Sequence, residues 1–349
     1  MPAAPDIFPR KSRHRGRGHP PGDNTMNKRH FVQGLGLLAA APWATSWAQS
    51  SGTGFPNKPI TLILPYAPGG PTDQHLRVVA EEAGKILGQP IVLDSRPGAN
   101  GVTAAAALTR ASADGYTLGV LPASVYREPY INKVPFDPTT SFSYIALLSD
   151  YSFGLAVRQD APWKTWADLV ADARKRPGAL NIGATGAMGT PRIVMEEVLA
   201  AAGVKANVVT YKGDADVATA ILGGHIDAAP LSGGAVPHID AHKMRYLVML
   251  TAQRVPRFPT LPTLKESGLD HFIDSPYGVA GPKGMDAARV AQLTAVFQKA
   301  LLSPAGMKAM ELLNQQPNYK DPAQYQRYAQ EAFAREKQRV AWLRDQGLL

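Results

Sequence analysis

The chain has 349 residues, 45% of them hydrophobic, and a formal net charge of +9 at pH 7. This length exceeds what one small hydrophobic core needs and suits two domains of ordinary size. The chain contains no cysteine, which excludes disulfides, thiolate catalysis, iron–sulfur clusters and cysteine-based zinc sites.

The positive charge is concentrated at the N-terminus. Residues 1–48 carry seven Lys or Arg and two Asp, which leaves 30 basic and 26 acidic residues for the rest of the chain. Mixed charge of this kind is typical of a solvated surface, whereas nucleic-acid binding needs a basic tract. We therefore expect no nucleic-acid partner.

Residues 26–48 have the pattern of a secretory signal peptide. Lys28 and Arg29 form the positive segment, residues 31–41 form an apolar run, and residues 46–48 place small residues at a cleavage site. The apolar run is shorter than the ~20 residues that span a bilayer, so a retained membrane anchor is the less favoured alternative. The basic pair also resembles a weakened twin-arginine signal, and both the Sec and the Tat route stay open.

Residues 1–25 precede this signal and are rich in Pro, Arg and Gly. Because an export signal normally begins a chain, we expect Met26 to be the true start. Residues 1–25 would then be untranslated or disordered. The pattern as a whole predicts a mature protein in the periplasm.

Downstream of the signal, segments of strand and helix periodicity alternate. Strands are predicted at residues 60–64, 91–93, 116–121, 180–183, 208–211, 228–231 and 246–250. Helices are predicted at residues 73–87, 101–111, 165–176, 190–201, 214–222, 236–242, 286–302 and 304–314, and from residue 321 onward. Thr165 and Asp321 are expected to cap their helices, and Pro322 suits a first helical position.

This alternation predicts an α/β fold of mostly parallel sheets flanked by helices. About ten strands are many for one twisted sheet in a chain of this length, so we expect two sheets. The apolar segments 145–157 and 272–281 have no helical period and are interpreted as crossings between domains. Domain 1 would comprise residues 49–150 and 271–349, and domain 2 residues 151–270.

Two glycine-rich loops follow predicted strands, where open α/β sheets bind ligands and helix N-termini offer N–H groups to anions. Loop one reads A-P-G-G-P-T-D at residues 67–73. Gly69 and Gly70 permit close approach of the backbone to a ligand. Thr72 or Asp73 can cap the next helix, so a plain turn is the alternative interpretation.

Loop two spans residues 183–192 and carries Gly183, Gly186 and Gly189 at intervals of three. This spacing is not G-x-G-x-x-G, and no Lys-Ser/Thr pair follows, so nucleotide binding is poorly supported. Arg192 falls in the first turn of the following helix. It could fork onto a carboxylate or project into solvent, and both interpretations stay open.

Ordered motifs run through residues 55–349. They include F-P-N-K-P-I at 55–60, P-G-G-P-T-D at 68–73, G-Q-P at 88–90, S-R-P-G-A-N-G at 95–101, D-G-Y-T-L at 114–118, F-D-P at 136–138, Y-K-G at 211–213, G-G-H-I-D at 223–227 and P-H-I at 237–239. In this order they resemble the substrate-binding proteins of the tripartite tricarboxylate transporter family, also called Bug receptors.

The resemblance implies a two-domain periplasmic binding protein of type II-like architecture, with a cleft between the domains. Such a protein binds a carboxylate largely through backbone N–H groups and presents it to membrane permease subunits. It is no enzyme, needs no cofactor and is expected to be a monomer. The positions that match the family's site are Pro68, Gly69, Gly70, Thr72, Asp73, Ala123, Ser124, Thr185, Gly186, Gly189 and Thr190.

The chain departs from the family pattern at charged positions. Arg192 stands where the family often has His, and Asp214 and Asp216 follow Y-K-G where the family usually has an uncharged run. Negative charge beside a site for anions disfavours a second carboxylate and could instead hold a ligand amine. The simpler interpretation, which we prefer, is that Asp214 caps its helix.

Other classes of protein fit less well. A hydrolase lacks its G-x-S-x-G elbow, because Ser232 is followed by Gly-Gly in another context. His238 and His242 could share a helical face and bind zinc, but a third ligand is missing and surface histidines are expected. A nicotinamide-dependent enzyme has only Asp94 in its favour. A sensor of carboxylates or amino acids without a dedicated permease is the main alternative function.

Overall fold

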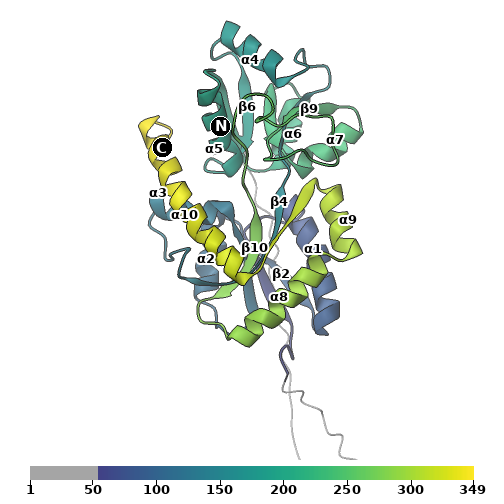
Figure 1. Ribbon diagram of the computed structural model, residues 1–349, viewed down its shortest axis with the longest axis vertical. Coiled ribbons are helices and arrows are strands. Elements are labelled where there is room, and N and C mark those ends of the chain that lie inside the picture. Colours follow the sequence, from purple (N-terminus) through teal and green to yellow (C-terminus); the bar gives the residue numbers. More distant parts are fainter. Residues whose placement is uncertain (1–53) are drawn as a thin grey trace, which may run out of the picture. The chain divides into compact units, whose positions relative to one another are not determined.

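The computed structural model describes residues 54–349, which lie in one compact unit of the chain (Figure 1). The predicted signal peptide at residues 26–48, the expected start at Met26 and the segment 1–25 lie outside the described residues. Within the described part, no helix is long and apolar enough to cross a membrane.

The first sheet has six strands in the order β11-β4-β10-β3-β1-β2. Strand β1 pairs in parallel with β2 and β3, whereas β10 runs antiparallel to β3 and β4, and β11 runs antiparallel to β4. The strands are β1 (Ile60–Leu64), β2 (Ile91–Ser95), β3 (Thr117–Pro122), β4 (Phe142–Tyr151), β10 (Tyr277–Pro282) and β11 (Gln315–Lys320).

The second sheet has five strands in the order β7-β6-β8-β5-β9. Strand β6 pairs in parallel with β7 and β8, and β5 runs antiparallel to β8 and β9. The strands are β5 (Gly154–Arg158), β6 (Asn181–Thr185), β7 (Asn207–Tyr211), β8 (Ala228–Leu231) and β9 (Met244–Met249).

The predicted α/β class with two helix-flanked sheets is confirmed, but the sheets are mixed and not mostly parallel. The correction comes from β5 and β10, each of which enters its sheet directly from the other one. The first residue of β5, Gly154, pairs with Leu231 at the end of β8, and Tyr277 of β10 pairs with Pro122 at the end of β3. A strand that enters at the carboxyl edge of its neighbours has to run antiparallel to them.

Helices flank both sheets, and α1, α8 and α9 lie beside the first one (Figure 1). The helices are α1 (Pro71–Leu87), α2 (Val102–Thr109), α3 (Glu128–Ile131), α4 (Trp166–Lys175), α5 (Thr190–Ala201), α6 (Asp214–Leu222), α7 (Val236–Asp240), α8 (Ala287–Leu301), α9 (Pro304–Leu312) and α10 (Pro322–Asp345). Thr165 and Asp321 cap α4 and α10 as predicted, each in a capping box.

Hydrophobic cores pack the strands that lead to the site against their neighbouring helices. Leu62 and Leu64 of β1 are fully buried and share one cluster with Leu76 and Val79 of α1. In the second sheet, Ile182 of β6 is buried in a cluster with residues of α4 and α5. Each such aliphatic side chain contributes about 1.5–3 kcal/mol on burial. The loops at the strand ends are therefore held by well-packed elements.

Candidate functional site

Both sheets carry their strand-to-helix connections at the carboxyl ends of their parallel strands. In the first sheet, β1, β2 and β3 lead into α1, α2 and a 3₁₀ turn at Ala123–Tyr126. In the second sheet, β6, β7 and β8 lead into α5, α6 and a 3₁₀ turn at Gly233–Ala235. Arg127, which follows β3, donates to Met188 and Thr190 in the connection after β6, so the two carboxyl edges meet.

The helices that begin at these edges have free N-termini. In the described part of the chain, α1, α2, α5 and α6 lack a side-chain cap, and each follows a glycine: Gly70, Gly101, Gly189 and Gly213. Uncapped first turns present backbone N–H groups, and the helix dipole adds partial positive charge. Together they suit an anion.

Helices at the opposite edges of the sheets are built differently. Helices α4, α8 and α10 follow the antiparallel strands β5, β10 and β11, and each begins at a capping side chain. Thr165, Asp286 and Asp321 accept hydrogen bonds from their own first turns. The missing caps are therefore a property of the carboxyl edges.

Loop one is held by Asp73. The N–H of Gly69, at a φ of 89°, donates to Oδ2 of Asp73 at 2.9 Å, and Arg77 donates to both oxygens of that carboxylate. The helix begins at Gly70, so the expectation that Thr72 or Asp73 caps it is wrong. Thr72 is buried, and its hydroxyl is hydrogen-bonded to that of Tyr151 at the end of β4. Pro68 lies exposed at the tip of the loop.

Loop two needs glycine for close packing. A Cβ on Gly189 would lie 2.1 Å from the carbonyl oxygen of Thr185, which no side chain could accommodate. Gly186 adopts a φ of 73°, and its N–H donates to the carbonyl of Tyr211 at 2.8 Å. These two glycines allow loop two to turn tightly before α5.

Arg192 braces the same loop from within. Its Nη1 donates to the carbonyl of Ala187 at 2.8 Å, and its Nη2 lies 3.5 Å from Oε1 of Glu196. The side chain is 15% exposed. Arg192 therefore does not project into solvent, and its Nη1 holds the backbone of loop two, whereas its contact with a ligand carboxylate stays a prediction.

Arg127 was not singled out from the sequence, yet it fixes loop two from the first sheet. It follows the 3₁₀ turn after β3 and is 0% exposed. Nη1 donates to the carbonyl of Met188 at 2.8 Å, and Nη2 donates to Oγ1 of Thr190 at 2.9 Å. Nε and Nη2 also donate to the carboxylate of Glu336 on α10, at 2.9 and 3.2 Å.

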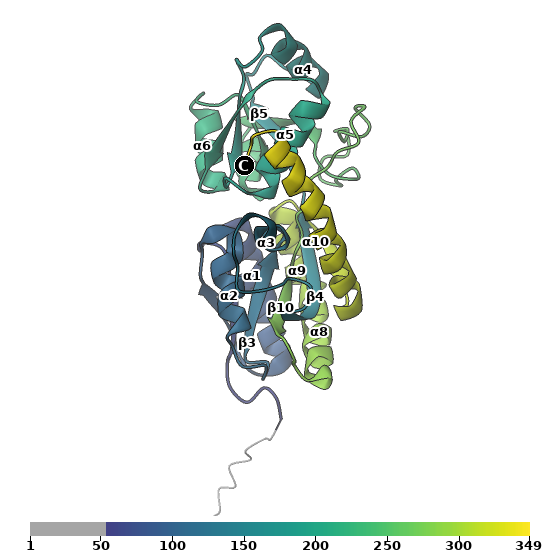
Figure 2. The ribbon, with the colours of Figure 1, turned by 90° about the vertical axis from the view of Figure 1, so that its left-hand side faces the viewer.

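A second arginine extends this contact. Arg339 of α10 donates to Glu336 at 2.7 Å and to Glu197 of α5 at 2.7 Å. Figure 2 shows α10 running from beside β4 to α5. The helix and Arg127 together connect the first sheet with the start and the body of α5.

The connections after β2 and β3 complete the first edge. Ser124 donates from Oγ to the carbonyl of Asn100 at 2.6 Å, and Asn100 donates to Glu128 at 2.9 Å. A Cβ on Gly186 would lie 3.9 Å from Oδ1 of Asn100, so this turn touches loop two. Ala123 is buried beside Ser124.

Asp214 is the first residue of α6, and Gly213 takes the cap position, so the preferred expectation that Asp214 caps its helix is wrong. Its Oδ1 accepts a hydrogen bond from Oγ1 of Thr185 at 2.7 Å. Burial raises the pKa of Asp214, which the Thr185 hydroxyl partly offsets. Burial raises the pKa of Tyr66, the residue before loop one, to about 12, and the charge of Asp214 adds to that rise. Asp216 lies exposed one step further along the helix.

The two crossings between the sheets lie side by side. Oδ1 of Asp150, near the end of β4, accepts hydrogen bonds from the N–H of Tyr151 at 2.8 Å and of Ser275 at 3.2 Å. One carboxylate thus links both segments. Burial, with repulsion from Asp274, raises the pKa of Asp150 to about 8.

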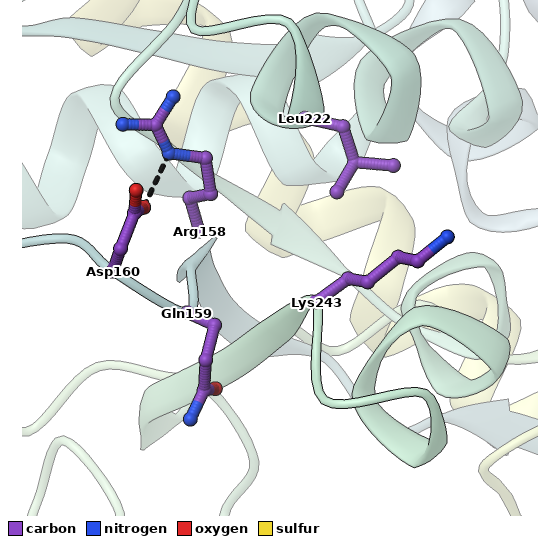
Figure 3. A pocket seen from close by; sticks show the side chains of 5 residues that line it. All are labelled: Arg158, Gln159, Asp160, Leu222 and Lys243. Atoms are coloured by element: carbon purple, nitrogen blue, oxygen red, sulfur yellow. Dashed lines mark hydrogen bonds and ion pairs between the residues drawn. The ribbon is translucent and has the colours of Figure 1, made fainter.

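A separate hollow of about 350 Å³ lies at the opposite edge of the second sheet. Arg158, Gln159, Asp160, Leu222 and Lys243 line it, and Arg158 is paired with Asp160 (Figure 3). Arg158 ends β5 beside the start of β8, far from the carboxyl ends. The residues that line this hollow include none of the predicted site residues.

His238 and His242, which could have bound zinc from one helical face, do not share such a face. Helix α7 ends at Asp240, and His242 follows it at a φ of 54°, whereas His238 lies within the helix. Among the described residues, no group of three His, Cys, Asp or Glu could hold a metal ion.

Two mixed sheets, two crossings and facing carboxyl edges form the fold of periplasmic solute-binding proteins. The family model described as the tripartite tricarboxylate transporter family receptor matches residues 75–343, and this chain belongs to that family. The resemblance seen in the ordered motifs is thereby confirmed.

The similarity to individual relatives extends over nearly the whole length of each relative. The UPF0065 protein in gbd 5'region of Cupriavidus necator is 38% identical over 315 residues, which cover 89% of this chain and 96% of that protein. The structure of R. palustris Rpa4515 with adipate has a TM-score of 0.76 at 27% identity and covers 82% of this chain and 98% of its own. The structure of the periplasmic binding protein BugD has a TM-score of 0.74 at 26% identity, with coverages of 84% and 99%.

Proposed function

We propose that this receptor captures a small organic carboxylate between the carboxyl edges of its two sheets. The uncapped helix N-termini carry the proposal, because α1 and α5 offer first-turn N–H groups where other helices of the chain have a capping side chain. The adipate bound to a relative of the same fold supports the choice of a carboxylate.

The residues proposed to surround the ligand come from both sheets. Arg127 joins the first sheet to loop two through Met188, and Asp214 joins loop two through Thr185. Arg192 contributes by fixing the backbone of loop two, and Asp216 is placed at the rim. The set is Pro68, Gly69, Gly70, Thr72, Asp73, Ala123, Ser124, Thr185, Gly186, Gly189, Thr190, Arg192, Asp214 and Asp216.

The proposal treats the chain as two domains that close on the ligand. Residues 49–150 and 271–349 form one domain and residues 151–270 the other, which agrees with the ends of β4 at Tyr151 and the start of β10 at Tyr277. A ligand that contacts both domains stabilises the closed state by its differential affinity.

We place the mature protein in the periplasm, as a monomeric receptor without catalytic activity. The signal peptide pattern at residues 26–48 and the periplasmic relative BugD support this location. The family supports the further step that the loaded receptor delivers its ligand to permease subunits of a tripartite tricarboxylate transporter.

Native mass spectrometry of freshly purified protein, followed by a thermal-shift screen, tests the binding proposal. The screen contains monocarboxylates, dicarboxylates, aromatic carboxylates and amino acids, with neutral sugars as the control class. A true ligand at 100 times its Kd should stabilise the protein by about 2.7 kcal/mol through mass action. Stabilisation by sugars and by no carboxylate would contradict the proposal.

A further inference from the structure

The charge at Asp214 bears on what the ligand carries besides a carboxylate, an inference that rests on the proposed function. Asp214 is enclosed by three connections. Oγ1 of Thr185 donates to it from loop two, and a Cβ on Gly234 would lie 2.8 Å from its Cβ. This carboxylate therefore lies at the carboxyl edge of the second sheet, among the connections that follow β6, β7 and β8.

Asp214 has no cation of its own. Among the described residues, its side chain takes part in no ion pair, and the hydroxyl of Thr185 is its donor. The nearest arginines of the site are engaged elsewhere, because Arg127 is paired with Glu336 and Arg192 faces Glu196. This half-buried carboxylate can therefore pair with a cationic group of a ligand.

Burial raises the pKa of Asp214, and two local features oppose that rise and favour the ionised form. The Thr185 hydroxyl donates to it, and the carboxylate sits in the first turn of α6, where the helix dipole stabilises negative charge. A second ligand carboxylate at this point would meet a like charge. A protonated amine would meet an opposite charge and could donate a charge-assisted hydrogen bond to it.

We propose that the receptor selects amino-carboxylates: the ligand carboxylate binds the free N–H groups of α1 and α5, and its protonated amine binds Asp214. Asp214 is then the residue that determines specificity among carboxylates. The uncapped helices supply affinity for any carboxylate, whereas Asp214 adds attraction for the amine and repulsion for a second acid.

Calorimetric titration with two matched ligand pairs tests this assignment. Succinate and aspartate differ by one amine, and in 5-aminopentanoate an aminomethyl group replaces one carboxylate of glutarate. In at least one pair the amine-bearing acid should bind about tenfold to a hundredfold more tightly, the range expected for a hydrogen bond between charged groups.

Asp214→Asn keeps the shape and removes the charge. It should reduce the preference for the amine by about tenfold or more, while the acid without the amine binds as well as or better than to the wild type. Asp270→Asn, at an exposed carboxylate outside the proposed site, is the matched control and should leave both affinities unchanged. Far-ultraviolet circular dichroism verifies that both variants are folded.

The outcomes separate the two levels of the proposal. Tighter binding of succinate and glutarate than of their amine-bearing partners would overturn the role of Asp214 and leave the carboxylate receptor intact. An amine preference that persists in Asp214→Asn would also overturn it. Failure of every carboxylate, with or without an amine, would overturn the proposed function as well.

Discussion

Helices at the two ends of each sheet begin in different ways. Helices α4 and α10 start at Thr165 and Asp321, whose side chains satisfy the first turn. Helices α1 and α5 start at Gly70 and Gly189, without a capping side chain. A capping side chain stabilises a helix by only a few tenths of a kcal/mol relative to glycine, so its omission at one edge leaves N–H groups free for a ligand at little cost in stability. The comparison indicates that the carboxyl edges, where α1 and α5 begin, are the edges that bind the ligand.

Removing Arg127 should have the largest effect on this edge. Arg127→Met leaves the carboxylate of Glu336 and the carbonyl of Met188 without their buried donor, and we expect a loss of about 3 kcal/mol in the free energy of unfolding. Affinity for the carboxylate should fall as well, because loop two loses its support. Denaturant unfolding and calorimetry measure the two effects.

The matched control is Arg254→Met, which removes an arginine from an exposed pair with Glu266. It should cost less than about 1 kcal/mol and leave binding unchanged. Equal effects of Arg127→Met and Arg254→Met would show that the buried arginine does not support loop two.

A capping side chain introduced at the N-terminus of α1 should remove the difference between this helix and the capped helices of the opposite edge. Gly70 has extended backbone angles, and a Cβ there would meet nothing closer than 3.9 Å, so Gly70→Asp should fold normally. The new carboxylate occupies the first-turn N–H groups of α1, and affinity for a ligand carboxylate should fall about a hundredfold. Stability should change by only a few tenths of a kcal/mol.

Gly70→Asn separates the cap from its charge. It also caps α1 but adds no negative charge, so its affinity should lie between those of the wild type and Gly70→Asp. Unchanged affinity in both variants would exclude the N-terminus of α1 from the site.

The carboxylate of Asp150 should make stability depend on pH at the crossings beside this edge. Its pKa rises from 3.8 to about 8 on folding, so its contribution to stability is full below pH ~4 and is lost as the pH rises through 8. Asp150→Asn cannot ionise, and at pH 9 it should be more stable than the wild type by about 1–2 kcal/mol, or a few degrees in Tm.

Tm is best compared from pH 6.5 to 9. Below that range His75, whose pKa burial lowers from 6.5 to about 4, adds a stability that is lost as the pH falls. Asp270→Asn, at an exposed carboxylate, should show the pH profile of the wild type. A profile of Asp150→Asn that matches the wild type would contradict the buried, protonated state of Asp150.

Removing a cap from the opposite edge should have the smallest effect. Asp321→Ala deletes the hydrogen bond to the N–H of Gln324 and should cost about 1 kcal/mol of stability. Ligand affinity should not change, since α10 begins far from the carboxyl edges. A loss of affinity comparable to that of Gly70→Asp would remove the distinction between the two edges.

Local sequence signals predicted most of the fold. Glycine and proline near strand ends marked the starts of α1 and α5, and Thr165 and Asp321 marked true caps. Strand β11 was missed, since Q-Q-P-N-Y-K has neither an apolar run nor strict alternation, and it lies at the edge of its sheet. Edge strands are half solvated and need no such pattern.

The site was predictable only in part. The glycine loops have a local signature, because their backbone geometry excludes side chains, as at Gly189. Arg127 has none: its partners Met188 and Glu336 are 61 and 209 residues away in the chain, and only the fold brings them together. The hydrogen bond between Asp214 and Thr185 could not be predicted from the sequence for the same reason, since Thr185 lies at the end of a different strand, β6.

Amide chemical shifts in a two-dimensional NMR titration with the tightest carboxylate test the central claim most directly. A carboxylate bound by free helix N-termini should shift the N–H signals of Thr72, Asp73 and Thr190 strongly downfield. The N–H groups of Asp168 and Gln324, which already donate to caps, serve as internal controls and should stay in place. Saturable binding that leaves the first three signals unmoved would contradict the account.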